Sequence, residues 1–141
     1  IYFAIGIFVF SPALSGDFIW DDWAYVVGNP LLDRADALRA IWLTKSTPDP
    51  WPITYTVFLL LKQMFGAEPL GYHVVSLVLH CLNAFLVFLI LRECRWRHAL
   101  LASLLFLIHP VNTESVAWVF QIKTLLAFTF ASLAILSWQQ K

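Results

Sequence analysis

The stretch that decides the fold of this chain is residues 70–91, LGYHVVSLVLHCLNAFLVFLIL. It holds 22 residues and contains no Lys, Arg, Asp or Glu. At ~1.5 Å per residue, a helix of this length crosses the ~30 Å hydrocarbon core of a bilayer. We therefore expect residues 70–91 to form a membrane span.

The composition of the whole chain agrees with this expectation. Hydrophobic residues make up 60% of the 141 residues, and the mean hydropathy is +0.75, which is far above the range of soluble globular domains. The formal net charge is zero, so no bulk attraction to nucleic acid is expected. Two cysteines do not make a disulfide framework. We predict an all-α membrane protein.

Three further apolar segments extend the membrane part. We interpret residues 1–14 as a partial span, residues 99–109 as a short span and residues 113–138 as a third span. The chain opens inside an apolar run, so we expect residues 1–141 to be a single N-terminal fragment of a larger membrane domain.

The charges predict the orientation of these spans. The loop at 92–98 carries three Arg, and short positive loops stay on the cytoplasmic side. Residues 15–69 would then form a large outer loop. Within it, the pattern predicts two short helices, one at 33–43 with Asp33 as its cap, and one at 53–65. The first is amphipathic and would lie in the membrane interface or on the surface of a folded loop domain.

Four polar residues share one face of the 70–91 helix, because they are spaced i, i+3, i+7 and i+10. They are His73, Ser76, His80 and Asn83. Such a stripe should face protein or a polar cavity rather than lipid. Interhelical hydrogen bonds and the wall of a substrate cavity are both open interpretations. A metal site formed by His73, His80 and His109 is disfavoured, because i, i+7 spans nearly two helical turns.

Two places in the sequence hold the polar groups that suggest chemistry. Asp21 and Asp22 lie in FIWDDW at 18–23, and carboxylates at a membrane edge are costly unless they are paired or used. His109 precedes a proline that breaks the short span, and Lys123 lies further along the next helix. A helix N-terminus, His109 and Lys123 together could hold a phosphate. The alternative is a structural Glu114–His109 pair with Lys123 extended towards the interface.

Four sequence strings resemble one family. They are FIWDDWAYV at 18–26 followed by Asn29-Pro30, FG at 65–66 with PLGYH at 69–73, LHCLNA at 79–84, and LIHPVNTESVAW at 107–118. The chain resembles the membrane part of the transmembrane O-mannosyltransferases that carry C-terminal tetratricopeptide repeats, and their bacterial relatives. These proteins belong to the GT-C superfamily of glycosyltransferases.

The resemblance implies a GT-C-like helical bundle whose active site lies under the first outer loop. It implies a membrane enzyme that moves a sugar, mannose in this family, from a polyprenyl-phosphate or dolichyl-phosphate donor to a protein hydroxyl on the outer or lumenal face. The membrane would be a bacterial inner membrane, or the endoplasmic reticulum membrane in a eukaryote. Alone, the fragment should be inactive, because GT-C sites also draw on later spans.

The resemblance also assigns roles to residues. Asp21 or Asp22, with Asp22 preferred, would be the base for the acceptor hydroxyl, which is worth ~10²–10⁴-fold in rate. Alternatively, the pair would bind a divalent cation, Mg²⁺ or Mn²⁺. The remaining candidates, as substrate-binding residues, are His73, His80, His109, Glu114 and Lys123. The cation of Lys123 suits a leaving phosphate.

The chain departs from the family pattern at two places. The pattern has a basic residue before Pro52, where this chain has Trp51, and an acidic-basic-basic-acidic string at 121–124, where only Lys123 is retained. These departures favour an alternative function, a non-catalytic membrane scaffold that anchors a repeat domain. A third hypothesis is a transporter with a discontinuous helix at His109-Pro110.

Overall fold

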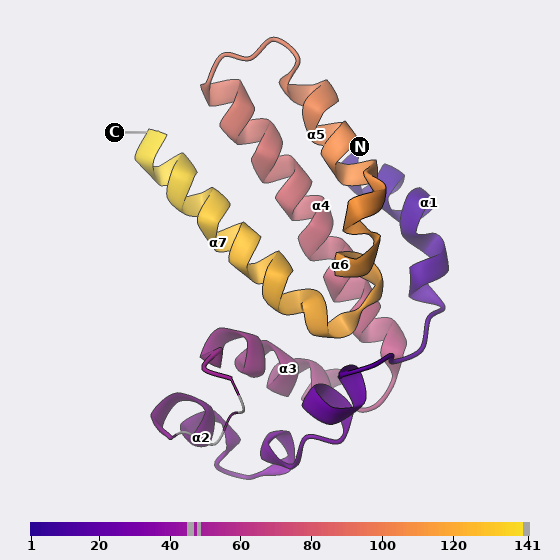
Figure 1. Cartoon of the computed structure of the whole chain (residues 1–141), viewed down its shortest axis with the longest axis vertical. Coiled ribbons are helices and arrows are strands. Elements are labelled where there is room, and N and C mark those ends of the chain that lie inside the picture. The colour runs from indigo at the N-terminus through magenta and orange to yellow at the C-terminus, as the bar shows by residue number, and fades with distance from the viewer. Residues whose placement is uncertain (45–46, 48, 140–141) are drawn as a thin grey trace.

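The computed structural model describes residues 1–44, 47 and 49–139, and no strand is present among them. The predicted all-α fold is confirmed (Figure 1). The α-helices are α1 (Tyr2–Leu14), α2 (Ala37–Leu43), α3 (Pro52–Phe65), α4 (Pro69–Glu93), α5 (Ala99–Ile108), α6 (Thr113–Ala117) and α7 (Ile122–Gln139). Four short turns of other helix types connect them: η1 (Trp23–Val27), η2 (Pro30–Asp33), η3 (Pro110–Asn112) and η4 (Val119–Gln121).

Among the described residues, two helical stretches are long and apolar enough to cross a membrane. They are α4, with 25 residues, and the 21-residue stretch Val119–Gln139 that contains α7. The pair formed by α5 and the stretch Pro110–Ala117 would be a third span if its two parts, bent by 50°, cross together. At 13 residues, α1 covers only about 20 Å.

The central element is α4, which packs against α1, α5, α6 and α7. In Figure 1 the loop between α4 and α5 lies at the upper end of this bundle, whereas α2 and α3 lie beyond its lower end. The basic loop and the long 15–69 segment are therefore at opposite ends of α4. The side of a membrane on which each end lies stays a prediction of the charge pattern.

Interhelical hydrogen bonds use part of the polar stripe on α4, whose four members are all buried. Nε2 of His80 lies 2.9 Å from the carbonyl oxygen of Leu107. The amide of Asn83 donates to the carbonyl of Leu125 at 3.0 Å and accepts from the Thr129 hydroxyl at 2.7 Å. Because each bond joins α4 to another helix, the stripe faces protein, as expected for polar groups in a membrane bundle.

The long segment before α4 folds onto itself differently from the prediction. Asp33 does not begin a helix through residue 43. Instead, the Asn29 side chain caps a separate turn at Pro30–Asp33, and α2 starts only at Ala37. Asp33 pairs with Lys62 at 2.7 Å, and Lys62 also donates to the Val27 carbonyl at 2.8 Å. These contacts tie the loop to α3.

The second loop helix follows the prediction closely. It begins at Pro52, a residue suited to the first helical turn. It ends at Gly66, whose φ of 61° is left-handed. α3 lies across the lower end of the bundle near the start of α7 (Figure 1).

The segment predicted as one span at 113–138 is divided. α6 contains only five residues, and Trp118 is extended, with φ −99° and ψ 112°. The chain then restarts as η4 and continues as α7. At this break the segment makes a contact with the long loop.

Candidate functional site

The Asp22 carboxylate makes the contact that joins the loop to the break before α7. Oδ1 accepts a hydrogen bond from the Phe120 N–H at 2.7 Å, and Oδ2 accepts from the Ile19 N–H at 3.0 Å. The side chain is completely buried. Burial raises the pKa of this carboxyl, and the backbone N–H donors of Ile19, Phe120 and Val119 partly oppose the rise.

Asp21 lies in a different environment, although it is the adjacent residue. Its side chain is exposed, whereas that of Asp22 is buried. The preceding residue, Trp20, has a φ of 48°, a conformation that residues other than glycine rarely adopt. Such backbone occurs often at functional sites. The turn thus places two neighbouring carboxylates in different environments: that of Asp22 is buried in the protein and that of Asp21 is exposed.

Lys123 lies one turn beyond Phe120 and is surrounded by aromatic rings. Its Nζ is 3.7 Å from the centre of the Phe120 ring, 4.8 Å from that of Trp51 and 5.7 Å from that of Trp118. These distances are those of cation–π contacts. The negative charges of Asp21 and Asp49 act electrostatically on this ammonium.

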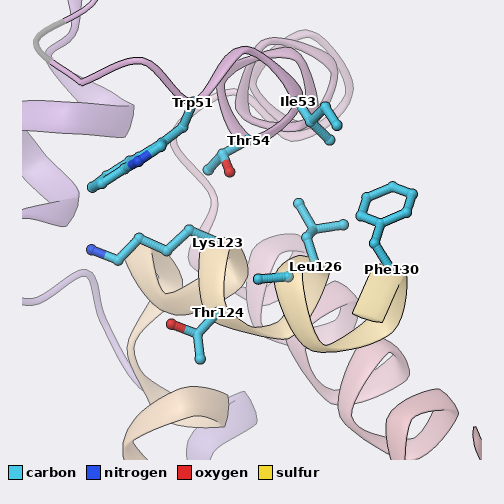
Figure 2. Close-up of a pocket in the computed structure, with 8 residues that line it drawn as sticks. Trp51, Ile53, Thr54, Lys123, Thr124, Leu126 and Phe130 are labelled. Atoms are coloured by element: carbon cyan, nitrogen blue, oxygen red, sulfur yellow. The ribbon is translucent and has the colours of Figure 1, made fainter. Parts of the chain in front are cut away.

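A groove of about 430 Å³ begins at Lys123 and runs between α3 and α7. Figure 2 shows the lysine ammonium close to the Trp51 ring, with Leu126 and Phe130 following along α7 and Ile53 opposite on α3. The groove is therefore cationic at one end and mainly apolar along its length. Its lining residues are Trp51, Ile53, Thr54, Lys123, Thr124, Leu126, Ala127 and Phe130.

The other candidate residues lie away from this groove. The His73 ring lies against Gly16, and neither ring nitrogen has a hydrogen bond of good geometry. His109 is exposed, and its Nδ1 accepts from the Val111 N–H at 3.2 Å. Glu114 is exposed and accepts from the Gln121 amide at 2.9 Å, so it pairs with Gln121 rather than with His109.

The acidic pair does not fit a shared cation site. Both oxygens of Asp22 already accept backbone N–H groups, and its side chain is buried, which leaves only Asp21 accessible. Within the described part of the chain, no group of three or more His, Cys, Asp or Glu side chains gathers where a metal ion could be held.

Sequence reasoning missed the aromatic part of the site. The sequence singles out Trp51 as a departure from the family pattern, and nothing in it points to Phe120. Three aromatic rings close to Lys123, those of residues 51, 118 and 120, were a usable signal, because rings and cations attract one another. Their convergence depends on the fold, since the pairs Trp20–Trp118 and Trp51–Phe120 bring together residues from the loop and from the start of α7.

Fold and site together define an all-helical protein of the membrane class, with a charged site where its long loop meets the bundle. Comparison with curated proteins shows relatives over most of the chain. It is 30% identical over 132 residues to a protein O-mannosyl-transferase of Caenorhabditis elegans, covering 83% of this chain and 19% of the relative. It is 30% identical over 161 residues to Protein O-mannosyl-transferase TMTC4 of Homo sapiens, covering 96% and 22%.

A third relative, Protein O-mannosyl-transferase Tmtc1 of Drosophila melanogaster, is 31% identical over 126 residues, covering 81% of this chain and 15% of the relative. The chain is thus a homologue of the protein O-mannosyl-transferases of the TMTC family, and the resemblance seen in the four strings is confirmed. It spans about a fifth of the length of these relatives. No family model and no solved structure matches the chain. The names of the relatives support a glycosyltransferase role.

Proposed function

We propose that this chain forms the outer-face part of the active site of a GT-C type membrane mannosyltransferase. The donor would be a polyprenyl-phosphate or dolichyl-phosphate sugar, and the acceptor a protein hydroxyl on the outer or lumenal side. One observation supports the proposal: the groove between α3 and α7 is mainly apolar and has the Lys123 ammonium, held by aromatic rings, at one end. Base, cation and apolar channel are the three features that such a donor and reaction require.

The reaction divides between the two charged groups. The acceptor oxygen attacks the anomeric carbon, and the bond from that carbon to the phosphate oxygen breaks. Asp21, which is exposed, takes the proton of the acceptor hydroxyl. The phosphate leaves with the bonding electron pair, and Lys123 stabilises the charge that develops on it. The lipid chain would lie along the groove between α3 and α7.

The test measures sugar transfer by the full-length protein in membranes, with a polyprenyl-phosphate mannose donor. We expect Asp21→Asn to lower kcat by about 10²- to 10⁴-fold, since it removes the base. We expect Lys123→Met to raise the KM for the donor and to lower kcat. Asp36→Asn, which changes an exposed loop carboxylate paired with Arg34, is the matched control and should be close to wild type. Full activity of Asp21→Asn would refute the assignment of the base.

The second candidate function is a non-catalytic membrane scaffold. The observation that favours it is the position of Trp51, whose ring packs against the cation at the place where the family pattern has a basic residue. Binding of labelled polyprenyl phosphate to the purified full-length protein separates the two functions. A donor-dependent signal that Lys123→Met abolishes supports the enzyme, and no binding supports the scaffold.

A further inference from the structure

We propose that Asp22 is a positioning residue: its carboxylate locks the Ile19–Asp22 turn to η4, which leads directly into α7, and so sets Asp21 relative to Lys123. The inference rests on the proposed function for its catalytic consequence, but the lock itself is a contact of the fold. It reverses the preference for Asp22 as the base. Three features of the described residues carry it.

The first feature is a reciprocal turn. The Asp22 N–H donates to the Ile19 carbonyl at 3.0 Å, and the Ile19 N–H donates to Oδ2 of Asp22 at 3.0 Å. Backbone and side chain of one residue thus close the same four-residue turn. The left-handed Trp20 lies inside it, and the closed turn holds this unfavourable backbone in place.

The second feature is the missing helical partner of an N–H group in η4, the turn that leads into α7. The first N–H groups of a helix have no acceptor within the helix, and a nearby side-chain oxygen usually supplies one. Here, the chain restarts after the extended Trp118, and the Phe120 N–H finds its acceptor in Asp22, 98 residues away in the sequence. A carboxylate at a helix start is also favoured by the helix dipole. Asp22 therefore acts as a cap supplied by the loop.

The third feature is the location of Asp21 and Lys123 relative to the hydrogen bond between Asp22 and Phe120. Asp21 directly precedes the carboxylate that accepts the hydrogen bond, and Lys123 follows the N–H that donates it by three residues. Ring contacts strengthen the same junction: Trp20 packs against Trp118 at 5.0 Å between ring centres. Asp22 is completely buried and each of its oxygens accepts a backbone N–H, whereas Asp21 is exposed.

The lock can be measured without any substrate. Hydrogen–deuterium exchange of a peptide covering residues 118–124 is followed in the full-length protein in detergent. Asp22→Asn is nearly isosteric but cannot accept both N–H groups, so we expect exchange at Phe120 to rise by roughly tenfold or more. Asp22→Glu keeps both acceptor oxygens at altered positions and should give an intermediate rise. Asp21→Asn should leave this exchange unchanged, and an unchanged rate in both Asp22 variants would overturn the lock.

Kinetics test whether the lock acts through Lys123. We expect Asp22→Asn to raise the donor KM by about tenfold and to keep the midpoint of the kcat–pH profile, whereas Asp21→Asn lowers kcat by about 10²- to 10⁴-fold. In a Lys123→Met background, Asp22→Asn should raise the donor KM no further, because the group it positions is gone. Loss of kcat in Asp22→Asn as complete as in Asp21→Asn, with KM unchanged, would overturn the positioning role. Absence of sugar transfer by the wild-type protein would refute the proposed function. The exchange measurement would still show whether Asp22 holds the Phe120 N–H.

Discussion

The ammonium of Lys123 lies 4.8 Å from the centre of the Trp51 ring, and these residues come from α7 and from the residue just before α3. Lysine side chains carry much rotamer freedom. The ring contacts restrict this freedom and keep the cation at the end of the groove. Trp51 stands where the family pattern has a basic residue. Its ring thus holds Lys123, the one basic residue of the 121–124 string that this chain retains.

This relationship predicts the effect of removing the ring. Trp51→Ala should weaken binding of polyprenyl phosphate by about 2- to 30-fold, the equivalent of roughly 0.5–2 kcal/mol for a cation–π contact. Trp51→Phe keeps a ring and should lose less. Equilibrium binding to the full-length protein measures both variants. Trp96→Ala removes a half-exposed tryptophan at the opposite end of α4 and should not change the affinity; an equal loss there would contradict the prediction.

The raised pKa of Asp22 predicts a pH dependence of stability. The folded state holds the proton of this carboxyl more tightly than the unfolded chain, whose pKa is near 3.8. The resulting stabilisation is fully present below that pH and is lost as the pH rises through the folded-state pKa. Asp22→Asn has no such proton, so wild type should lose stability relative to this variant over that window. Denaturant unfolding at a series of pH values measures the difference.

Asp36 serves as a control, because its pH dependence of stability should have the opposite sign. The hydrogen bonds from Arg34 lower the pKa of Asp36. Its contribution is present above the unfolded pKa and is lost as the pH falls through the lower folded-state pKa. Asp36 is exposed, so the effect of Asp36→Asn should be small. A pH dependence of the same sign in both variants would contradict the interpretation of Asp22.

The two hydrogen bonds between Asn83 and α7 predict that replacing Asn83 lowers the stability of the helix bundle. Asn83→Leu removes a donor to the Leu125 carbonyl and an acceptor for Thr129. Hydrogen bonds between membrane helices contribute about 0.6 kcal/mol on average and up to ~1.7 kcal/mol. We expect a loss in this range in thermal unfolding of the detergent-solubilised protein. Thr129→Ser keeps the hydroxyl and should lose less; a larger loss than in Asn83→Leu would show that packing dominates.

The close approach of α1 to α4 gives the last prediction. A Cβ atom added at Gly6 would lie 2.5 Å from Sγ of Cys81 and 3.4 Å from a methyl group of Leu77. Gly6→Ala should therefore destabilise the contact by roughly 1–3 kcal/mol, as overpacking does. Cys81→Ala removes the sulfur, so the double variant should be more stable than Gly6→Ala alone. Limited proteolysis of α1 and thermal unfolding report on the contact, and strict additivity of the two changes would contradict it.

Composition and periodicity were sufficient for the elements whose formation is local. The uncharged run at 70–91 predicted α4, because its length and apolarity meet the requirement of a bilayer without reference to any neighbour. Gly66 predicted the end of α3 because only glycine enters left-handed backbone at little cost. The four motif strings likewise pointed to the relatives that the comparisons then found.

The break at Trp118 and the separate environments of Asp21 and Asp22 could not be predicted in this way. Residues 113–138 are apolar enough for one continuous helix, and the acceptor of the Phe120 N–H after the break comes from a loop 98 residues away. Two adjacent aspartates carry the same local signal, but one is buried against backbone N–H groups and the other is exposed. The apolar pattern by itself determined which segments form the helices of the bundle, because the tendency of a side chain to leave water depends on its own chemistry. Tertiary structure alone decided which carboxylate is buried against backbone N–H groups and which is exposed, because a hydrogen bond depends on where the rest of the fold brings its partner.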